Sequence, residues 1–122
     1  MSPAMAPPVA PEIFKAYDIR GIVDKTLTEE AAERIGRALG TLGARKKVKR
    51  FVVGRDGRLS GPRLVAALTR GLNAAGMDVT DIGVVATPMV YFATYELATG
   101  SGVMVTGSHN PPEYNGLKMM VA

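Results

Sequence analysis

The hydrophobic and polar positions along this chain follow two patterns in alternation, one typical of strands and one typical of helices. Short runs rich in valine and isoleucine, ended by glycine or aspartate, predict buried strands. Segments with apolar residues three and four positions apart predict helices with one buried face. The strands are expected over residues 12–16, 50–56, 78–85, 102–107 and 116–122. The helices are expected from Thr28 to Gly43, from Ser60 to Gly76 and over residues 88–98.

Capping residues support the starts of these helices. Thr28, Ser60 and Thr87 each stand where a side-chain oxygen can accept hydrogen bonds from the first backbone N–H groups of a helix. Pro88 suits the first helical position because its φ angle is already helical. Between the first strand and the first helix, residues 18–21 are expected to form a polar turn.

The order of the expected elements predicts the fold class. Strands and helices alternate until the last two strands, which a loop joins, and this order predicts an α/β layered domain over residues 12–122. Its sheet is expected to be mixed, largely parallel and flanked by helices, with ligands at the carboxyl ends of the strands. Residues 1–11, rich in proline and alanine, are expected to form a flexible tail. Because no helix follows the last apolar strand, the chain is expected to be a piece of a longer protein, truncated before its final helix.

Composition narrows the class of protein. With 122 residues, 47% of them hydrophobic and 21% charged, the sequence is typical of one soluble globular domain. The absence of cysteine excludes disulfides, a thiolate zinc site and a cysteine nucleophile. No apolar stretch is long enough to span a membrane, and the proline-rich start lacks the basic region of a secretory signal. A cytoplasmic protein without a membrane partner is expected.

The net charge of +4 raises the alternative of a nucleic-acid-binding module. The densest basic run, RKKVKR at residues 45–50, lies between an expected helix end and an expected strand start, where cations stabilise the helix C-terminus. Aromatic residues make up only 6% of the chain, and no basic and aromatic stripe offers bases a stacking surface. A solvated turn is therefore favoured, and no nucleic-acid partner is expected.

The segment VTGSHNPPEYNGLK, residues 105–118, carries the candidate chemistry. Ser108 follows an apolar strand through Gly107, whose backbone freedom would allow a tight turn that lifts the hydroxyl to the strand's carboxyl end. The further polar groups of the segment are His109, Asn110 and, on the next strand, Lys118. Serine, asparagine and proline are also ordinary turn residues, so a connecting loop without chemistry is the alternative.

The kinds of residue favour phosphoryl chemistry over hydrolysis. Adjacent serine and histidine do not easily form the base contact of a catalytic triad, and the G-x-S-x-G elbow is absent. A phosphate on Ser108 could be stabilised by backbone N–H groups of the loop, by Lys118 and by Arg20. The absence of a GxxxxGK[ST] motif argues against a nucleotide triphosphatase. GRDGR, residues 54–58, could contact phosphate, but a solvated strand-to-helix loop is favoured for it.

Four segments in order resemble the first domain of the α-D-phosphohexomutases, and most closely their bacterial phosphomannomutase/phosphoglucomutase branch. They are KAYDIRG, VVGRDGRLSGPRL, ATPMVYFA and GVMVTGSHNPPEYNGLK, and the resemblance runs from Glu12 to Ala122. Members of this family are similar in having three related α/β domains and a smaller last domain around one active-site cleft. They interconvert the 1-phospho and 6-phospho forms of a hexose through a bisphosphorylated hexose.

The resemblance implies roles for individual residues. Ser108 would be the phosphoserine that gives and takes back the phosphoryl group, and one of its phosphate oxygens would bind Mg²⁺. The residues that match neighbours of this phosphoserine are His109, Asn110 and Lys118, with Lys118 a candidate for proton handling or charge stabilisation. The residues that match groups reaching into the cleft from the first turn are Tyr17 and Arg20.

The resemblance also implies what these 122 residues lack. The aspartate-rich metal loop, the sugar-specificity loop and a further phosphate-binding loop belong to the later domains of the family. The chain is therefore expected to act with those domains on a phosphosugar, mannose or glucose, and to be inactive alone. Many relatives carry alanine where this chain has Gly107, and the glycine form with PPEYNG resembles the phosphomannomutase/phosphoglucomutase branch. A phosphoglucosamine mutase is the alternative.

Overall fold

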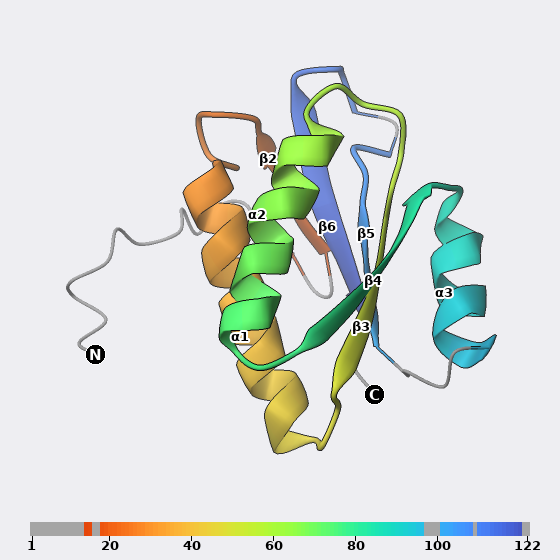
Figure 1. Cartoon of the computed structure of the whole chain (residues 1–122). Helices are drawn as coiled ribbons and strands as arrows, with labels where there is room; N and C mark the ends of the chain where they lie inside the picture. Colours follow the sequence, from red (N-terminus) through yellow and green to blue (C-terminus); the bar gives the residue numbers. More distant parts are fainter. Residues whose placement is uncertain (1–13, 16–17, 97–100, 109, 121–122) are drawn as a thin grey trace.

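The computed structural model describes residues 14–15, 18–96, 101–108 and 110–120. The tail expected over residues 1–11 lies outside them. The described residues form six strands and three helices in one sheet-based domain (Figure 1). The elements are β1 (Phe14–Lys15), β2 (Asp18–Ile22), α1 (Glu29–Arg45), β3 (Arg50–Arg55), α2 (Gly61–Ala74), β4 (Asp78–Val84), α3 (Thr87–Glu96), β5 (Gly102–Val105) and β6 (Tyr114–Met120).

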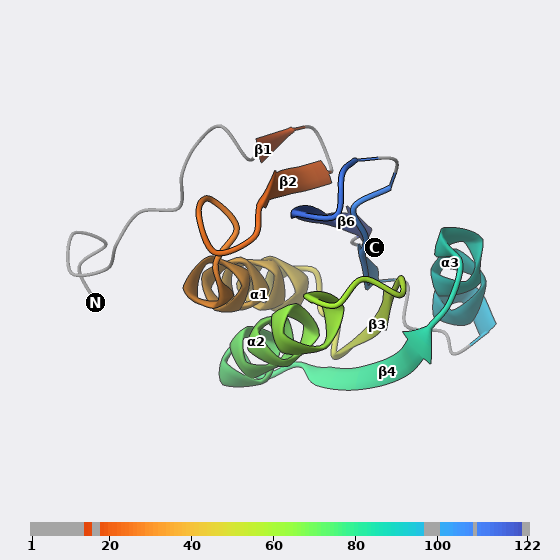
Figure 2. The ribbon, with the colours of Figure 1, turned by 90° about the horizontal axis from the view of Figure 1, so that it is seen from above.

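The strands form one mixed sheet in the order β1-β2-β6-β5-β3-β4. Strand β3 pairs in parallel with β4 and β5, whereas β5–β6, β6–β2 and β2–β1 pair antiparallel. The predicted α/β domain with a mixed sheet is confirmed, but parallel pairing is confined to β5, β3 and β4 among the described residues. Seen from above, α1 and α2 lie on one face of the sheet and α3 lies on the other (Figure 2).

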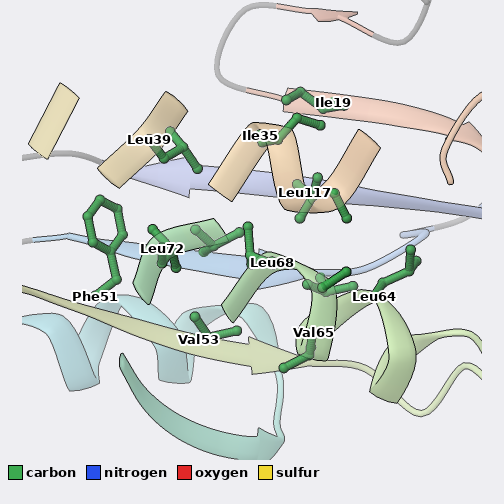
Figure 3. Close-up of a cluster of buried hydrophobic side chains, with 14 of the residues drawn as sticks. Ile19, Ile35, Leu39, Phe51, Val53, Leu64, Val65, Leu68, Leu72 and Leu117 are labelled. Carbon is green, nitrogen blue, oxygen red and sulfur yellow. The ribbon is translucent and has the colours of Figure 1, made fainter. Parts of the chain in front are cut away.

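The larger hydrophobic core lies between the sheet and the helices α1 and α2 (Figure 3). Phe51 and Val53 of β3 point into it, while Val52 between them packs with Val90 of α3 on the opposite face. This is the two-residue alternation of a strand that is buried on both sides. The apolar run of β3 therefore fixes which helices cover each face.

Helices α1 and α2 approach each other through glycines. A Cβ atom at Gly36 of α1 would overlap the carbonyl oxygen of Leu68 in α2. A Cβ atom at Gly71 of α2 would overlap the carbonyl oxygen of Glu33 and lie 2.7 Å from the backbone nitrogen of Arg37, both in α1. The two helix backbones are thus closer than helices with larger side chains at these positions would allow.

The predicted N-cap of α1 is confirmed. The predicted side-chain hydrogen bond at the N-cap of α2 is not formed. The Thr28 side chain accepts a hydrogen bond of 3.0 Å from the backbone N–H of Ala31. Ser60 stands at the N-cap position of α2, but its hydroxyl makes no cap hydrogen bond. It accepts instead from the Nδ2 group of buried Asn115, at 2.8 Å. A partner distant in sequence has replaced the local cap.

The polar turn predicted for residues 18–21 is wrong, because these residues belong to β2. They pair antiparallel with β6, and Ile19 lies opposite Leu117 with only 3% of its surface exposed. The polar residues mark the outer face of the strand, since Ile19 between them points into the core. The pairing partner is almost one hundred residues away in the sequence, so no local pattern reveals it.

The basic run at residues 45–50 forms the predicted turn between a helix and a strand. Helix α1 ends at Arg45, Lys47 takes a left-handed φ of 63°, and β3 begins at Arg50.

Within the described parts of the chain, no helix has the length and apolar character needed to cross a membrane.

Candidate functional site

The candidate site lies where the parallel strands β3 and β5 end side by side. Asp56 follows β3 and Thr106 follows β5, and the pairing of Arg55 with Val105 brings the two ends together. The Asp56 backbone N–H donates to the carbonyl oxygen of Val105 at 3.0 Å. Carboxyl ends of parallel strands are the usual place for ligands in an α/β sheet. The segment from residue 106 to 114, here called the Ser108 loop, starts at this edge.

The Asp56 carboxylate fixes the start of the Ser108 loop. One oxygen, Oδ2, accepts from the Thr106 hydroxyl at 2.8 Å and from the Gly107 backbone N–H at 3.2 Å. The other oxygen accepts from the Arg58 backbone N–H at 3.1 Å. The Thr106 hydroxyl oxygen in turn accepts from the Ser108 backbone N–H at 3.0 Å. Asp56 is therefore connected to Ser108 through one hydroxyl.

The Arg58 guanidinium holds four further backbone carbonyl groups of the Ser108 loop. Its Nε donates to Asp56 at 3.3 Å, and its two terminal nitrogens donate to four backbone carbonyl oxygens. These carbonyls belong to Ser108 at 3.0 Å, Asn110 at 2.8 Å, Pro111 at 2.8 Å and Tyr114 at 3.2 Å. One side chain from the β3–α2 connection thus holds a loop that is fifty residues further along the chain.

Gly107 is needed for space, which differs from the reason predicted. Its φ is not among the left-handed glycine angles of the described residues. A Cβ atom at this position would instead overlap the Arg58 guanidinium. An alanine here would require the guanidinium to move.

Ser108 has a strained backbone. Its φ of 53° lies in the left-handed region, which is uncommon for a residue other than glycine. Such strain persists only where surrounding contacts hold it, and it concentrates at functional sites. Here the contacts include the Asn110 backbone and side-chain N–H groups, which both donate to the Gly107 carbonyl oxygen at 3.0 and 2.9 Å. The loop is therefore fixed around Ser108 from both sides.

The backbone N–H groups that were expected to face a phosphate are already engaged. Those of Gly107, Ser108 and Asn110 donate to Asp56, Thr106 and Gly107 respectively. In the described part of the loop, these three donors are unavailable to a phosphate on Ser108. These three N–H groups would therefore contribute little to balancing the charge of such a phosphate.

Arg20 and Lys118 lie on one face of the sheet beside this loop. Arg20 of β2 is opposite Gly116 of β6, and Lys118 is opposite Asp18 in the same pair of strands. Because their neighbours Ile19 and Leu117 point into the core, both cations project from the opposite face. The structure thus brings these two predicted residues together.

Lys118 is further from Ser108 along the sheet than the sequence suggested. Thr106 is level with Gly116, because its backbone N–H donates to the Gly116 carbonyl oxygen at 3.0 Å. Lys118 lies two residues beyond Gly116, which is about 7 Å of strand. The predicted residues His109 and Tyr17 lie outside the described residues.

Sequence reasoning missed Asp56 and Arg58, which hold the Ser108 loop. The GRDGR segment leads from β3 toward α2 as predicted, but the prediction that it is solvated is wrong for two of its side chains. The Arg58 and Asp56 side chains are only 17% and 26% exposed and bind the Ser108 loop. A signal was present in Pro111 and Pro112, which lack N–H groups and leave the loop short of donors.

The hydrogen bonds of Asp56 determine how it responds to acid. Partial burial alone would raise the pKa of this carboxyl. The bonds from Thr106 and from the backbone N–H groups of Arg58 and Gly107, with the charge of Arg58, outweigh burial and lower it. The charged carboxylate therefore stabilises the fold above the ordinary pKa of about 4, and this contribution is lost as the pH falls through the lower folded-state pKa.

We expect Asp56→Asn to lower the free energy of unfolding at neutral pH and to matter less in acid. Urea unfolding from pH 7 to pH 2.5 would measure the difference between wild type and variant. That difference should stay constant down to about pH 5 and shrink below about pH 4, where Asp56 of the unfolded wild type takes up a proton at a higher pH than Asp56 of the folded protein. The exposed carboxyl of Asp24, whose pKa is also lowered, is present in both proteins and cancels. A difference that stayed the same at pH 3 would contradict this assignment.

The described residues do not by themselves form a site for Mg²⁺. Among them, no three histidine, cysteine, aspartate or glutamate side chains gather as possible metal ligands. The carboxylate that is tied to the Ser108 loop, Asp56, already accepts four hydrogen bonds from Thr106, Gly107 and Arg58. An Mg²⁺ ion held near Ser108 needs ligands from outside this set.

Comparison with known proteins gives consistent matches. Residues 11–122 match the family described as phosphoglucomutase/phosphomannomutase, alpha/beta/alpha domain I. The chain is 58% identical over 113 residues to a phosphoglucomutase of Neisseria meningitidis serogroup B, covering 93% of this chain and 25% of that protein. It is 54% identical over 122 residues to a phosphomannomutase/phosphoglucomutase of Pseudomonas aeruginosa, covering 100% of this chain and 26% of the relative.

A solved structure agrees with the sequence matches. The crystal structure of a phosphoglucomutase/phosphomannomutase family protein from Burkholderia thailandensis superposes with a TM-score of 0.87 at 50% identity. That match covers 93% of this chain and 26% of the other. The chain thus spans about a quarter of the length of the relatives it matches. By sequence and by fold, the chain belongs to the phosphoglucomutase/phosphomannomutase family and corresponds to its alpha/beta/alpha domain I.

Proposed function

We propose that this chain, with residues 12–122 as its domain, is the phosphoserine domain of an enzyme that interconverts hexose 1-phosphate and hexose 6-phosphate. The hexose is mannose, glucose or both, and the intermediate is a bisphosphorylated hexose. The observation that carries the proposal is the backbone of Ser108, a non-glycine residue with a φ of 53° at the carboxyl end of β5. A hydrogen bond from Arg58 to the Ser108 carbonyl oxygen, and one from the Ser108 N–H to the Thr106 hydroxyl within the loop, fix the backbone on both sides of it.

The transfer requires little covalent chemistry from the side chains around Ser108. In one half-reaction the bond between phosphorus and Ser108 Oγ breaks while a hexose hydroxyl oxygen bonds to the same phosphorus. The hydroxyl proton leaves to a base, and the serine oxygen ends with a proton. The reverse half-reaction takes the other phosphoryl group from the bisphosphorylated hexose. Phosphoryl transfer depends mainly on position and charge stabilisation, which a fixed loop with nearby cations supplies.

Arg20 and Lys118 are the cations proposed to stabilise the charge of the phosphoryl group. They share one sheet face beside the Ser108 loop, so both can offset negative charge on a phosphoryl group. Lys118 is also the candidate that exchanges the proton. His109 and Asn110 would position the phosphoserine, and Tyr17 with Arg20 would contact the phosphosugar. These roles for individual residues rest on the resemblance described above.

The proposed activity belongs to a longer protein. Because the chain spans about a quarter of its relatives' length, the other domains would supply the sugar contacts and the remaining Mg²⁺ ligands. The 122 residues alone would be inactive. The enzyme is proposed to be cytoplasmic, with a phosphosugar as substrate and neither nucleic acid nor membrane as partner.

Radioactive label on the serine tests the proposal directly. The full-length enzyme is incubated with a hexose bisphosphate labelled in its phosphoryl groups, and the digested protein is mapped for label. Label on the peptide that contains Ser108 is the expected result, and a wild-type protein without label would overturn the proposal. Turnover of mannose, glucose and glucosamine phosphates by the same protein separates the proposed sugars from the alternative of a phosphoglucosamine mutase.

A further inference from the structure

We propose that Arg58 is a positioning residue for phosphoryl transfer, because it holds the Ser108 loop in the shape that presents the phosphoserine. This inference rests on the proposed function of Ser108. Arg58 comes from the connection between β3 and α2, fifty residues before Ser108. It acts on the backbone of the loop, and its described hydrogen bonds go to no group that reacts.

The Ser108 loop has more backbone acceptors than donors. Pro111 and Pro112 each contribute a carbonyl group but no N–H group. Ser108, Asn110 and Tyr114 are half-buried, and half-buried carbonyls without a donor cost free energy, so the loop needs donors from elsewhere. Arg58 supplies them to Ser108, Asn110, Pro111 and Tyr114, which span both sides of the proline pair.

The geometry uses the full donor capacity of an arginine. A guanidinium has five N–H groups in one plane. In this structure Nε donates to Asp56, one terminal nitrogen donates to the Pro111 and Tyr114 carbonyls, and the other donates to the Ser108 and Asn110 carbonyls. A lysine has three donors on one rotating group and cannot reproduce this fork. Arg58→Lys therefore keeps the charge and removes the geometry.

The Asp56 carboxylate already balances the charge of Arg58, so we infer that Arg58 acts on the shape of the loop and not on the charge of the phosphate. Its guanidinium is paired with the Asp56 carboxylate, and Gly107 lies directly against the guanidinium. A carbonyl oxygen released from Arg58 would be free to turn toward the phosphoryl group, where its partial negative charge is repulsive. The expected result of losing Arg58 is a misplaced phosphoserine in a chain that still folds.

The test compares Arg58→Lys with Arg63→Lys in the full-length enzyme. Arg63 is a suitable control because it is also near the start of α2, but its ion pairs go to Asp24 and Glu29 and not to the loop. Both variants are first charged with labelled hexose bisphosphate. Single-turnover transfer from the phosphoserine to a hexose monophosphate is then measured per mole of bound label, so that any unfolded fraction does not count. The ³¹P resonance of the phosphoserine is recorded for each charged protein.

Arg58→Lys should slow transfer by about 10- to 100-fold, because a displacement near 1 Å at a reacting group has effects of this size. Its ³¹P resonance should shift or broaden. Amide exchange at Asn110 and Tyr114, whose N–H groups donate within the loop, should speed up while Val52 in β3 stays protected. Arg63→Lys should match wild type in all three measurements.

Each outcome decides a different statement. Equal transfer rates and equal ³¹P signals for wild type and Arg58→Lys would overturn the positioning role and leave the proposed function standing. A slower rate with an unchanged ³¹P signal and unchanged loop exchange would also overturn it, since the loop would then keep its shape. A wild-type protein that takes up no label would overturn the proposed function, and the role of Arg58 with it, before any variant is compared.

Discussion

Ser108→Ala in the full-length enzyme should abolish interconversion of the hexose phosphates, with a loss of turnover on the order of 10⁴-fold or more. The substitution removes the oxygen that carries the phosphoryl group, and loss of a covalent carrier has effects of at least this size. Labelled hexose bisphosphate should leave no label on the variant. A coupled assay of hexose 6-phosphate formation measures the loss of turnover. Labelling of the wild type gives its concentration of active enzyme.

The same substitution at Ser60 provides the matched control. Ser60 is buried at the start of α2, and its hydroxyl accepts from Asn115 at 2.8 Å. Ser60→Ala leaves that amide without its partner, so it should cost about 1 to 3 kcal/mol of stability while transfer per folded molecule stays near wild type. Turnover by Ser108→Ala at a tenth of the wild-type rate would exclude Ser108 as the phosphoryl carrier.

Local patterns were sufficient to predict most of the fold. An apolar run within one segment predicts each of the buried strands β3 and β5. Apolar residues at helical spacing within one segment predict each of the amphipathic helices α1 and α2. Strand β2 is not predicted in this way, because its polar residues serve the outer face and only Ile19 enters the core. Its pairing with β6 depends on residues almost one hundred positions away.

The candidate site divides in the same way. Ser108 could be located from the sequence because an apolar strand leads to it through a glycine. The importance of Arg58 could not, because its role consists of hydrogen bonds to carbonyl groups fifty residues later. Gly107 illustrates both cases: a tight position was predicted, but the guanidinium that makes it tight belongs to another segment.

Gly71→Ala should destabilise the domain by about 2 kcal/mol. By helix propensity alone the substitution would stabilise α2 by about 1 kcal/mol, since glycine is a poor residue inside a helix. Packing has the opposite sign and is larger. The new Cβ would overlap the Glu33 carbonyl oxygen and lie 2.7 Å from the Arg37 nitrogen. Both are backbone atoms of α1, so relief requires the two helices to separate, and overpacking typically costs about 1 to 3 kcal/mol.

Gly57→Ala is the control that isolates this effect. The chemical change is the same, but a Cβ atom at Gly57 meets nothing within 4 Å, and no left-handed φ is recorded there. It should change stability by less than about 1 kcal/mol, in the stabilising direction, because the unfolded chain loses freedom. Urea unfolding of the three proteins measures both differences. Equal stability of Gly71→Ala and Gly57→Ala would show that α1 and α2 have room to separate. The close contact between these helices would then contribute little to the stability of the domain.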